Sequence, residues 1–196
     1  MRAVVVYESM FGNTHAIADA IGTGIGQGLE PVDDVVVVPV VEAGGERLAD
    51  ADLLVVGGPT HFRGMSRTRT RKWAASIAQK PKNDLVLDRD AQGPGVRDWL
   101  TSLGPGHTKV AAFDTRFKGP AVLRGRASKP ISRTLRRHGF EVVAKPESFF
   151  VTLQTHLEPD EEARAREWGK RLAASVVGHV VINGDRPRRP ATSTET

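Results

Sequence analysis

The residues best suited to bind a ligand lie near the amino terminus, where short polar side chains surround a glycine. Ser9, Gly12, Asn13 and Thr14 follow closely after the apolar run Ala3–Val6. Hydroxyl and amide groups donate hydrogen bonds to an anion, and a glycine lets the backbone approach that anion closely. Because the segment contains no lysine, these residues predict a phosphate site built from neutral donors.

The elements on either side of this loop support the same prediction. Ala3–Val6 is uninterrupted and rich in β-branched residues, which is typical of a parallel strand buried on both faces. From His15 onward isoleucines recur every four residues, at positions 17, 21 and 25, and this period predicts a helix. The loop thus joins the carboxyl end of a strand to the amino end of a helix, where free N–H groups and the helix dipole attract anions.

Two common phosphate-binding motifs, the Gly-x-x-x-x-Gly-Lys-Ser/Thr loop and the Gly-x-Gly-x-x-Gly fingerprint, are absent here. The run Tyr7–Thr14 instead resembles the phosphate loop of flavodoxins, which has a hydroxyl residue, two variable positions, Gly, one further position and Thr. The resemblance implies FMN as the cofactor. It assigns phosphate binding to Ser9, Met10, Phe11, Gly12, Asn13 and Thr14. The alternative is a plain turn that caps the helix.

A second candidate loop leaves the third predicted strand, Asp52–Gly58. Its sequence from Gly58 to Met65, Gly-Pro-Thr-His-Phe-Arg-Gly-Met, resembles the ring-binding loop of flavodoxin-like NAD(P)H:quinone oxidoreductases. The resemblance places along the isoalloxazine ring Pro59, Thr60, His61, Phe62, Arg63 and Gly64. Many flavodoxins stack a Trp or Tyr on the ring, and the candidates here are His61 and Phe62. The alternative for His61 is an ordinary histidine of a surface loop.

A third candidate loop follows the fourth predicted strand, Lys109–Thr115, where flavodoxins have their last flavin loop. The resemblance assigns to the pyrimidine edge of the ring Asp114, Thr115, Arg116, Phe117 and Gly119. Arg116 or Lys118 near the N1–C2=O edge would stabilise an anionic reduced flavin. The alternative role for Arg116 is an ion pair that anchors the loop.

Strand and helix patterns alternate along the rest of the chain, which predicts an α/β fold with right-handed crossovers. Val35–Val38 predicts a second strand, and Pro39 indicates that this strand ends early or lies at a sheet edge. Helices are predicted near 46–51, 73–77, 96–103, 129–138 and 160–177, and a divided fifth strand at 141–143 and 148–151. The resemblance specifies a flavodoxin-like three-layer α/β/α sandwich over residues 1–182, with a five-stranded parallel sheet of order 2-1-3-4-5.

Composition restricts the chemistry that the chain can perform. With 196 residues, 39% of them hydrophobic and 26% charged, it is typical of a single soluble globular domain. Residues 183–196 include only Ala191 as an apolar residue and predict a disordered tail. No apolar run approaches a membrane span and the chain starts on a strand, so we expect a cytoplasmic protein. Because cysteine is absent, redox chemistry would require an organic cofactor.

The charge differs from that of most flavodoxins, which are acidic, because the formal net charge here is +5. Five cations lie within ten residues beside the second loop, namely Arg63, Arg67, Arg69, Arg71 and Lys72. This run predicts a solvated face, a site for the phosphate groups of NAD(P)H, or a contact with an acidic redox partner or nucleic acid. Nucleic acid is disfavoured, since no recognition-helix, ribonucleoprotein or zinc pattern is present.

Together these patterns predict an FMN-binding protein that acts in electron transfer. Acid–base pairs and nucleophile constellations are not evident, so any substrate chemistry would be hydride transfer through the flavin, and no metal site is expected. One alternative is an NAD(P)H-dependent quinone or flavin reductase, which would oxidise NAD(P)H by itself. The other is a regulatory or interaction module that kept the fold and lost the flavin.

Overall fold

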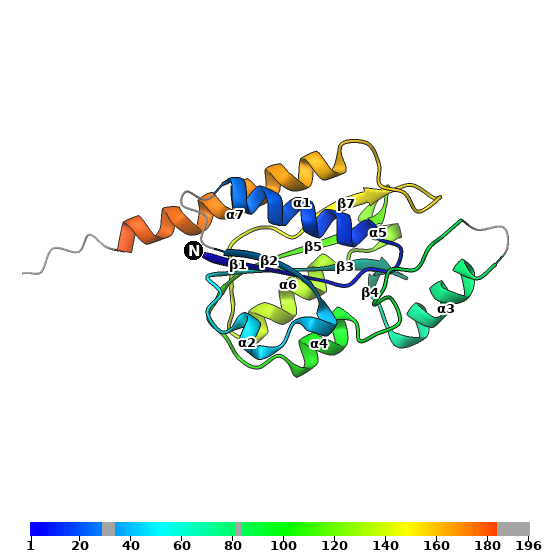
Figure 1. Ribbon diagram of the computed structural model, residues 1–196, viewed down its shortest axis with the longest axis horizontal. Coiled ribbons are helices and arrows are strands. Elements are labelled where there is room, and N and C mark those ends of the chain that lie inside the picture. Colours follow the sequence, from blue (N-terminus) through cyan, green and yellow to red (C-terminus); the bar gives the residue numbers. More distant parts are fainter. Residues whose placement is uncertain (29–33, 81–83, 184–196) are drawn as a thin grey trace, which may run out of the picture.

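A parallel sheet with helices on both faces forms the centre of the computed structural model, which describes residues 1–28, 34–80 and 84–183 (Figure 1). The strands are β1 (Arg2–Tyr7), β2 (Asp34–Pro39), β3 (Leu53–His61), β4 (Gly64–Met65), β5 (Lys109–Phe117), β6 (Glu141–Val142) and β7 (Glu147–Val151). The helices are α1 (Asn13–Gln27), α2 (Gly45–Leu48), α3 (Thr68–Ala78), α4 (Val96–Ser102), α5 (Ala121–Arg124), α6 (Ser128–Arg137) and α7 (Glu161–Asn183), and a short 3-10 helix covers Val40–Glu42.

The strands follow the order β2-β1-β3-β5-β6, with β7 also paired to β5. β6 pairs with the start of β5, at Lys109 and Val110, and β7 pairs with its end, from Phe113 to Phe117. β6 and β7 therefore occupy one strand position in two pieces, which confirms both the predicted order and the divided fifth strand. Within the described residues β2 pairs only with β1, so the edge position suggested by Pro39 is also confirmed.

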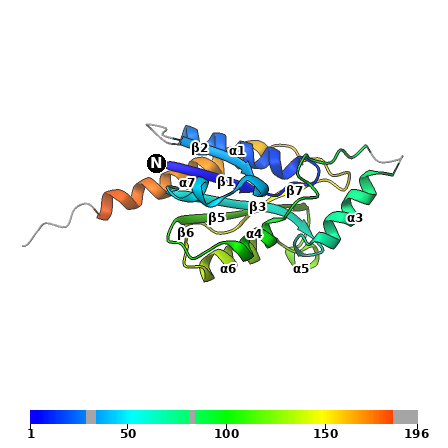
Figure 2. The same ribbon diagram turned by 60° about the horizontal axis from the view of Figure 1, so that its bottom comes forward.

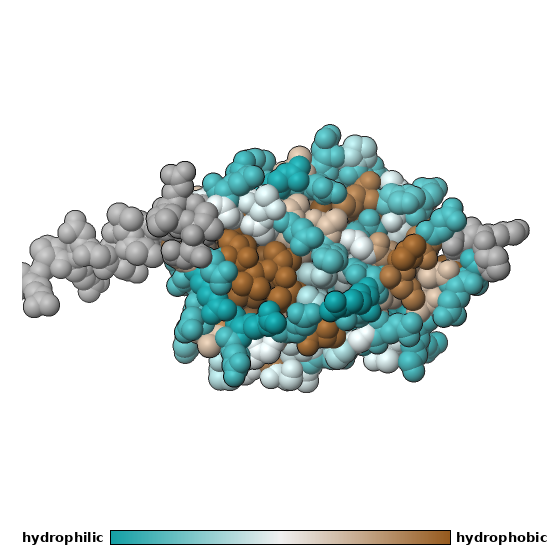
Figure 3. All heavy atoms as spheres, in the orientation of Figure 1, coloured by the Kyte–Doolittle hydropathy of each residue, from teal (hydrophilic) through white to brown (hydrophobic). Residues whose placement is uncertain are grey.

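Alternation along the buried strands sends side chains into two separate cores. On one face of the sheet, Ala3 and Val5 of β1 pack in a cluster that includes residues of α1 and α7. On the other face, Val4 and Val6 pack in a cluster that includes residues of α4 and α6. Figure 2 shows the same layers from another direction, and Figure 3 shows hydrophobic side chains exposed over the edge strand β2. The continuous apolar sequence of β1 is thus explained by burial on both faces.

The first and last helices approach each other closely because glycines lie at their contact. A Cβ at Gly24 of α1 would lie 2.0 Å from the backbone oxygen of Arg166, and one at Gly169 of α7 would lie 2.4 Å from that of Ile21. We expect Gly24→Ala to reduce the free energy of unfolding by about 1–3 kcal/mol, because the helices must move apart. The matched control is Gly26→Ala in the same helix, where the nearest atom lies 4.0 Å away. That variant should be neutral or more stable by up to about 1 kcal/mol. Equal changes in the free energy of unfolding for the two variants, measured in urea, would contradict the prediction.

Two further expectations concern the carboxyl-terminal tail and the presence of a membrane-spanning helix. The predicted disordered tail, 183–196, lies outside the described residues apart from Asn183, the last residue of α7. Across the described ranges, the helices lack the length or the apolar character that crossing a bilayer requires.

Candidate cofactor site

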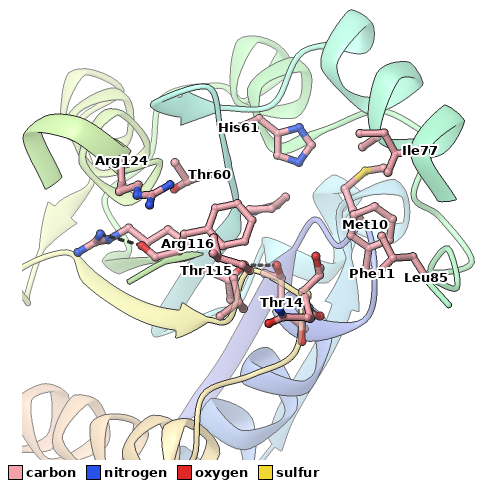
Figure 4. Close-up of a pocket in the computed structure, with 18 of the residues that line it drawn as sticks. Met10, Phe11, Thr14, Thr60, His61, Ile77, Leu85, Thr115, Arg116 and Arg124 are labelled. Carbon is pink, nitrogen blue, oxygen red and sulfur yellow. Dashed lines mark hydrogen bonds between the residues drawn. The ribbon is translucent and has the colours of Figure 1, made fainter. Parts of the chain in front are cut away.

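A large pocket lies at the carboxyl end of the sheet, where a flavodoxin-like arrangement would place its ligand. Its volume is about 890 Å³, and it is lined by the β1–α1 loop, the β3–β4 hairpin, the end of β5, the end of α5, the β7–α7 loop and α3. Figure 4 shows side chains from these segments directed toward a common space. The three loops singled out in the sequence therefore meet at one site.

The β1–α1 loop leaves the amino end of α1 available to a ligand. No side chain caps this helix, whose preceding residue Gly12 has a φ of +83°. The Ser9 hydroxyl instead accepts a hydrogen bond from the Gly12 N–H at 3.1 Å, within the loop. The segment therefore contains the turn of the alternative interpretation but not its side-chain cap. The first N–H groups of α1 have no partner inside the helix and converge at its positive end, which is the arrangement that binds phosphate.

A glycine is required at position 12 by the backbone and not by crowding. A Cβ there would meet no described atom within 4 Å, yet the positive φ is one that branched side chains rarely adopt. Beside it, the Thr14 hydroxyl lies 2.7 Å from the Thr115 hydroxyl of β5. This bond, drawn in Figure 4, joins the first candidate loop to the third.

The β7–α7 loop is a fourth wall that the sequence analysis missed. The Asn13 side-chain amide donates to the backbone oxygen of Thr155 at 2.8 Å. This contact holds the loop beside the phosphate-binding segment, and the pocket is consequently lined also by Leu153, Gln154, Thr155 and His156. No local pattern marks these residues, because their role depends on a contact with a residue 142 positions earlier in the chain.

The second candidate loop is a hairpin instead of an open loop. β3 extends to His61 and turns back through Phe62 and Arg63 into β4, with Thr60 opposite Met65. Both turn residues have positive φ, 43° and 75°. The Thr60 hydroxyl accepts a hydrogen bond from the Ala127 N–H at 2.9 Å, which ties the hairpin to the segment before α6.

The hairpin separates the two candidates for stacking on a planar ring. Figure 4 shows the His61 ring inside the pocket, whereas the Phe62 side chain is 73% exposed. Phe62 instead contacts Trp73 of α3, with 5.3 Å between ring centroids. Of the two, His61 therefore has the better position for a ligand held in the pocket.

Burial lowers the pKa of His61 from its ordinary 6.5 to about 4, with a further contribution from the nearby charge of Arg71. The ring should therefore be neutral at pH 7. Between these two pKa values the unfolded chain binds a proton that the folded protein does not, so stability should fall as the pH drops from about 6.5 to about 4. An NMR titration should find the His61 ring changing charge near pH 4, and His61→Gln should remove this part of the pH dependence. A midpoint near 6.5 would contradict the placement of the ring.

Two charged residues of the third candidate loop, Asp114 and Arg116, have partners within the protein. Asp114 is fully buried beneath the pocket, where it accepts a hydrogen bond from the Ser128 N–H at 2.7 Å, and burial raises its pKa. The Arg116 guanidinium donates to the Gly119 oxygen at 2.9 Å and lies 4.8 Å from the centre of the Phe150 ring. Figure 4 shows it directed away from Thr14 and His61. Arg116 therefore anchors the loop, as in the alternative interpretation, but through a carbonyl and an aromatic ring instead of an ion pair with a described carboxylate.

Most of the predicted site residues line the pocket. They are Met10, Phe11, Asn13, Thr14, Pro59, Thr60, His61, Phe62, Arg63, Thr115, Arg116 and Phe117. The others support the loops from outside the lining, and they are Ser9, Gly12, Gly64, Asp114 and Gly119. Contact between any of them and a cofactor stays a prediction.

Helix α3 adds an apolar wall that the loop motifs did not indicate. Figure 4 shows Met10, Phe11, Ile77 and Leu85 grouped on one side of the pocket, opposite Arg116. Ala74 of α3 packs in a small core with Met10 and Ala91. The pocket therefore offers polar donors at one end and an apolar surface at another, as a ligand with a charged group and a planar ring requires.

A buried polar cluster attaches α3 to the rest of the site. Arg71, which the sequence grouped with the exposed cations, is only 3% exposed. Its guanidinium donates to the Ser66 hydroxyl at 3.0 Å and to the Asp98 carboxylate at 2.8 Å. Glu8 lies beside this cluster and accepts the Val96 N–H at 2.8 Å, and burial raises the pKa of its carboxyl. A surface role for Arg71 was therefore the wrong interpretation.

Solved structures resemble this chain over nearly its whole length. A flavodoxin from the domain Archaea matches with a TM-score of 0.60 and 21% identity, covering 90% of this chain and 99% of that one. The chain has the flavodoxin-like fold. A flavodoxin, WrbA-like protein from Agrobacterium tumefaciens matches at 0.59 and 19%, covering 91% and 98%. Rubredoxin oxygen:oxidoreductase from Desulfovibrio gigas matches at 0.60 and 16%, where the likeness covers 91% of this chain and 37% of that one.

Sequence comparisons add no closer relative to this fold-level likeness. No protein-family model matches the chain, and no curated protein matches it. Among the described residues, no group of three or more His, Cys, Asp or Glu side chains is placed to hold a metal ion.

Proposed function

We propose that the protein binds FMN noncovalently in the pocket and acts in electron transfer. The observation that carries the proposal is the uncapped amino end of α1, which opens beside a pocket of about 890 Å³ with an apolar wall. FMN has the two parts that this arrangement suits, a phosphate dianion and a planar ring. The flavodoxins among the structural neighbours support a flavin-binding role at the level of the fold.

The donor set fits the phosphate group. The N–H groups at the start of α1, together with the side chains of Asn13 and Thr14, would surround the phosphate, and Gly12 supplies the required backbone angle. Asn13 and Thr14 are already oriented by Thr155 and Thr115, so little ordering is needed on binding.

The remainder of the pocket fits the ring. His61 and the hairpin would lie along one side of it, and the end of β5 would lie at another. When bound, FMN supplies the one- or two-electron redox chemistry that the protein side chains lack. The chain's own contribution would be to hold the phosphate, orient the ring, and present a neutral imidazole, since burial keeps the pKa of His61 low.

An NAD(P)H-dependent quinone or flavin reductase is the second candidate. It is favoured by Arg63 and Arg124, which line the same pocket and would attract the phosphate groups of a dinucleotide. Steady oxidation of NAD(P)H by the FMN-loaded protein would establish the reductase. A carrier would show no turnover without a partner.

A titration with FMN tests the proposal directly. The purified protein should form a yellow complex with one equivalent of FMN, visible as a shift of the flavin absorption bands and as altered flavin fluorescence. A preparation that stays colourless after reconstitution and dialysis would favour the flavin-free regulatory or interaction module. Location in the cytoplasm stays a prediction.

A further inference from the structure

Large hydrophobic side chains are exposed around the mouth of the pocket. Five of the pocket-lining residues are of this kind: Phe62 (73% exposed), Leu153 (71%), Leu123 (64%), Trp73 (55%) and Phe117 (37%). Single exposed apolar residues are common on any protein, but a group of them around one opening indicates an interaction surface. We call this group the apolar rim.

Exposed cations accompany the apolar rim. Arg69 and Lys72 are exposed on α3, and the spacings of three and four residues make both Lys72 and Trp73 neighbours of Arg69 on the helix surface. Arg63 and Arg124 are exposed in the pocket lining itself. None of these four has a carboxylate partner within 4.0 Å among the ion pairs of the described residues. The pocket lining includes three arginines, Arg63, Arg116 and Arg124, and one carboxylate, Asp84, so the mouth of the pocket has an excess of positive charge.

The tip of the hairpin adds a separate sign that this surface serves a purpose other than stability. A two-residue turn with positive φ at both positions favours Asn-Gly, yet here it is formed by Phe62 and Arg63. The turn therefore contains backbone strain, and the exposed Phe62 side chain contributes little to the core. Strained backbone of this kind clusters at binding sites, and this turn holds an aromatic and a cationic side chain in solvent.

Helix α3 presents this surface away from the body of the protein. Figures 1 and 2 show α3 projecting beyond the carboxyl end of the sheet, outside both helical layers. Its buried side is fastened by Arg71 to Ser66 and Asp98. The opposite side, with Arg69 and Lys72, is thereby held in a defined position without being covered.

We propose that α3 and the hairpin tip dock an acidic redox protein over the mouth of the pocket, with Arg69 and Lys72 facing its carboxylates and the apolar rim at the centre of the contact. This inference rests on the proposed function, since the docked partner would exchange electrons with the cofactor. Charge complementarity favours an acidic partner. A dinucleotide is a poorer fit to this surface, because Arg69 and Lys72 do not line the pocket and a nucleotide inside it would leave the rim exposed.

Binding to redox proteins of opposite charge tests the proposal, using an acidic [2Fe–2S] ferredoxin and the cationic cytochrome c as probes. Calorimetry at low ionic strength should detect binding of the ferredoxin to both the FMN-loaded and the flavin-free protein. It should detect no binding of cytochrome c. The double variant Arg69→Gln/Lys72→Gln should weaken ferredoxin binding about tenfold or more, and added salt should reduce the difference. The matched control is Arg136→Gln/Arg137→Gln, which removes the same charge from exposed residues in the last turn of α6. This variant should leave ferredoxin binding unchanged.

A third variant separates the apolar contribution from the charge. Trp73→Ala should weaken ferredoxin binding at high salt as well as at low salt. The proposal is overturned if the ferredoxin does not bind, if cytochrome c binds instead, or if the two double variants behave alike. It is also overturned if Arg69→Gln/Lys72→Gln raises the KM of the FMN-loaded protein for NADPH and leaves ferredoxin binding unchanged. If the protein binds the ferredoxin but takes up no FMN, the proposed function is refuted and the proposed docking surface is still supported.

Discussion

FMN should bind at least about a hundredfold more tightly than riboflavin, which has the same ring without the phosphate. Each hydrogen bond to a charged group contributes about 1.5–3 kcal/mol, so two such bonds from the start of α1 already account for this ratio. The donors are in place, since α1 has no side-chain cap and Thr14 is oriented by Thr115. Flavin fluorescence titrations with both compounds would measure the ratio.

A glycine substitution shows whether the selectivity arises at the loop. Gly12→Val should abolish most of the difference between FMN and riboflavin, because a branched residue resists the φ of +83° and the loop must change shape. The matched control is Gly44→Val, at a position with extended backbone and no neighbour within 4 Å of a Cβ. Equal affinities for the two flavins in the wild type, or a folded Gly12→Val protein with unchanged selectivity, would refute the phosphate site.

Arg71→Met should reduce the free energy of unfolding by about 1–3 kcal/mol, which is the usual cost of leaving a buried polar group without its partner. The cost is below that of a fully buried ion pair because the side chain of Asp98 is 46% exposed. Methionine keeps much of the arginine's volume but leaves the Ser66 hydroxyl without this donor, beside the buried carboxyl of Glu8. Asp98 would lose its charged partner and keep only the hydrogen bond from the Gly95 N–H. The cluster is also crowded, since a Cβ at Gly95 would lie 2.4 Å from Arg71 Nη1 and 2.7 Å from Glu8 Oε2. Rearrangement around the lost charge is therefore restricted.

Urea unfolding of Arg71→Met and Arg69→Met would measure this effect. Arg69 lies two residues earlier on the same helix and is exposed, so its substitution should change stability by less than about 0.5 kcal/mol. Because Arg71 fastens the wall of the pocket, Arg71→Met should also weaken FMN binding, and Arg69→Met should leave FMN binding unchanged. Similar unfolding curves for the two variants would show that the buried cluster contributes little to stability.

Local pattern was sufficient for the positions of the main strands and for the loop between β1 and α1. Ala3–Val6 is apolar at every position because both faces of β1 are covered, so its burial can be read from sequence. The glycine, hydroxyl and amide residues from Ser9 to Thr14 indicated a strand-to-helix loop, since conformational preference is a property of each residue. The divided last strand was likewise visible from Pro146 between two β-rich runs.

The roles of individual charged and aromatic residues depended on the tertiary structure. Arg71 belongs to a run of cations that looks uniform in the sequence, yet helix geometry turns it inward toward Asp98 while Arg69 stays in solvent. His61 and Phe62 are neighbours, but the hairpin turn places the first in the pocket and the second at its rim.

By itself, then, the sequence determined which segments form the main strands and which loop carries the candidate phosphate site, because those depend on periodicity and on the backbone preferences of single residues. The order of the strands was predicted from the resemblance to flavodoxins. The tertiary structure decided what the long side chains contact. It turned Arg116 onto a carbonyl and Phe150, and it brought Thr155 to Asn13 across 142 positions. Such contacts have no local signal, since a guanidinium or an amide takes whichever partner the packed chain places within hydrogen-bond distance.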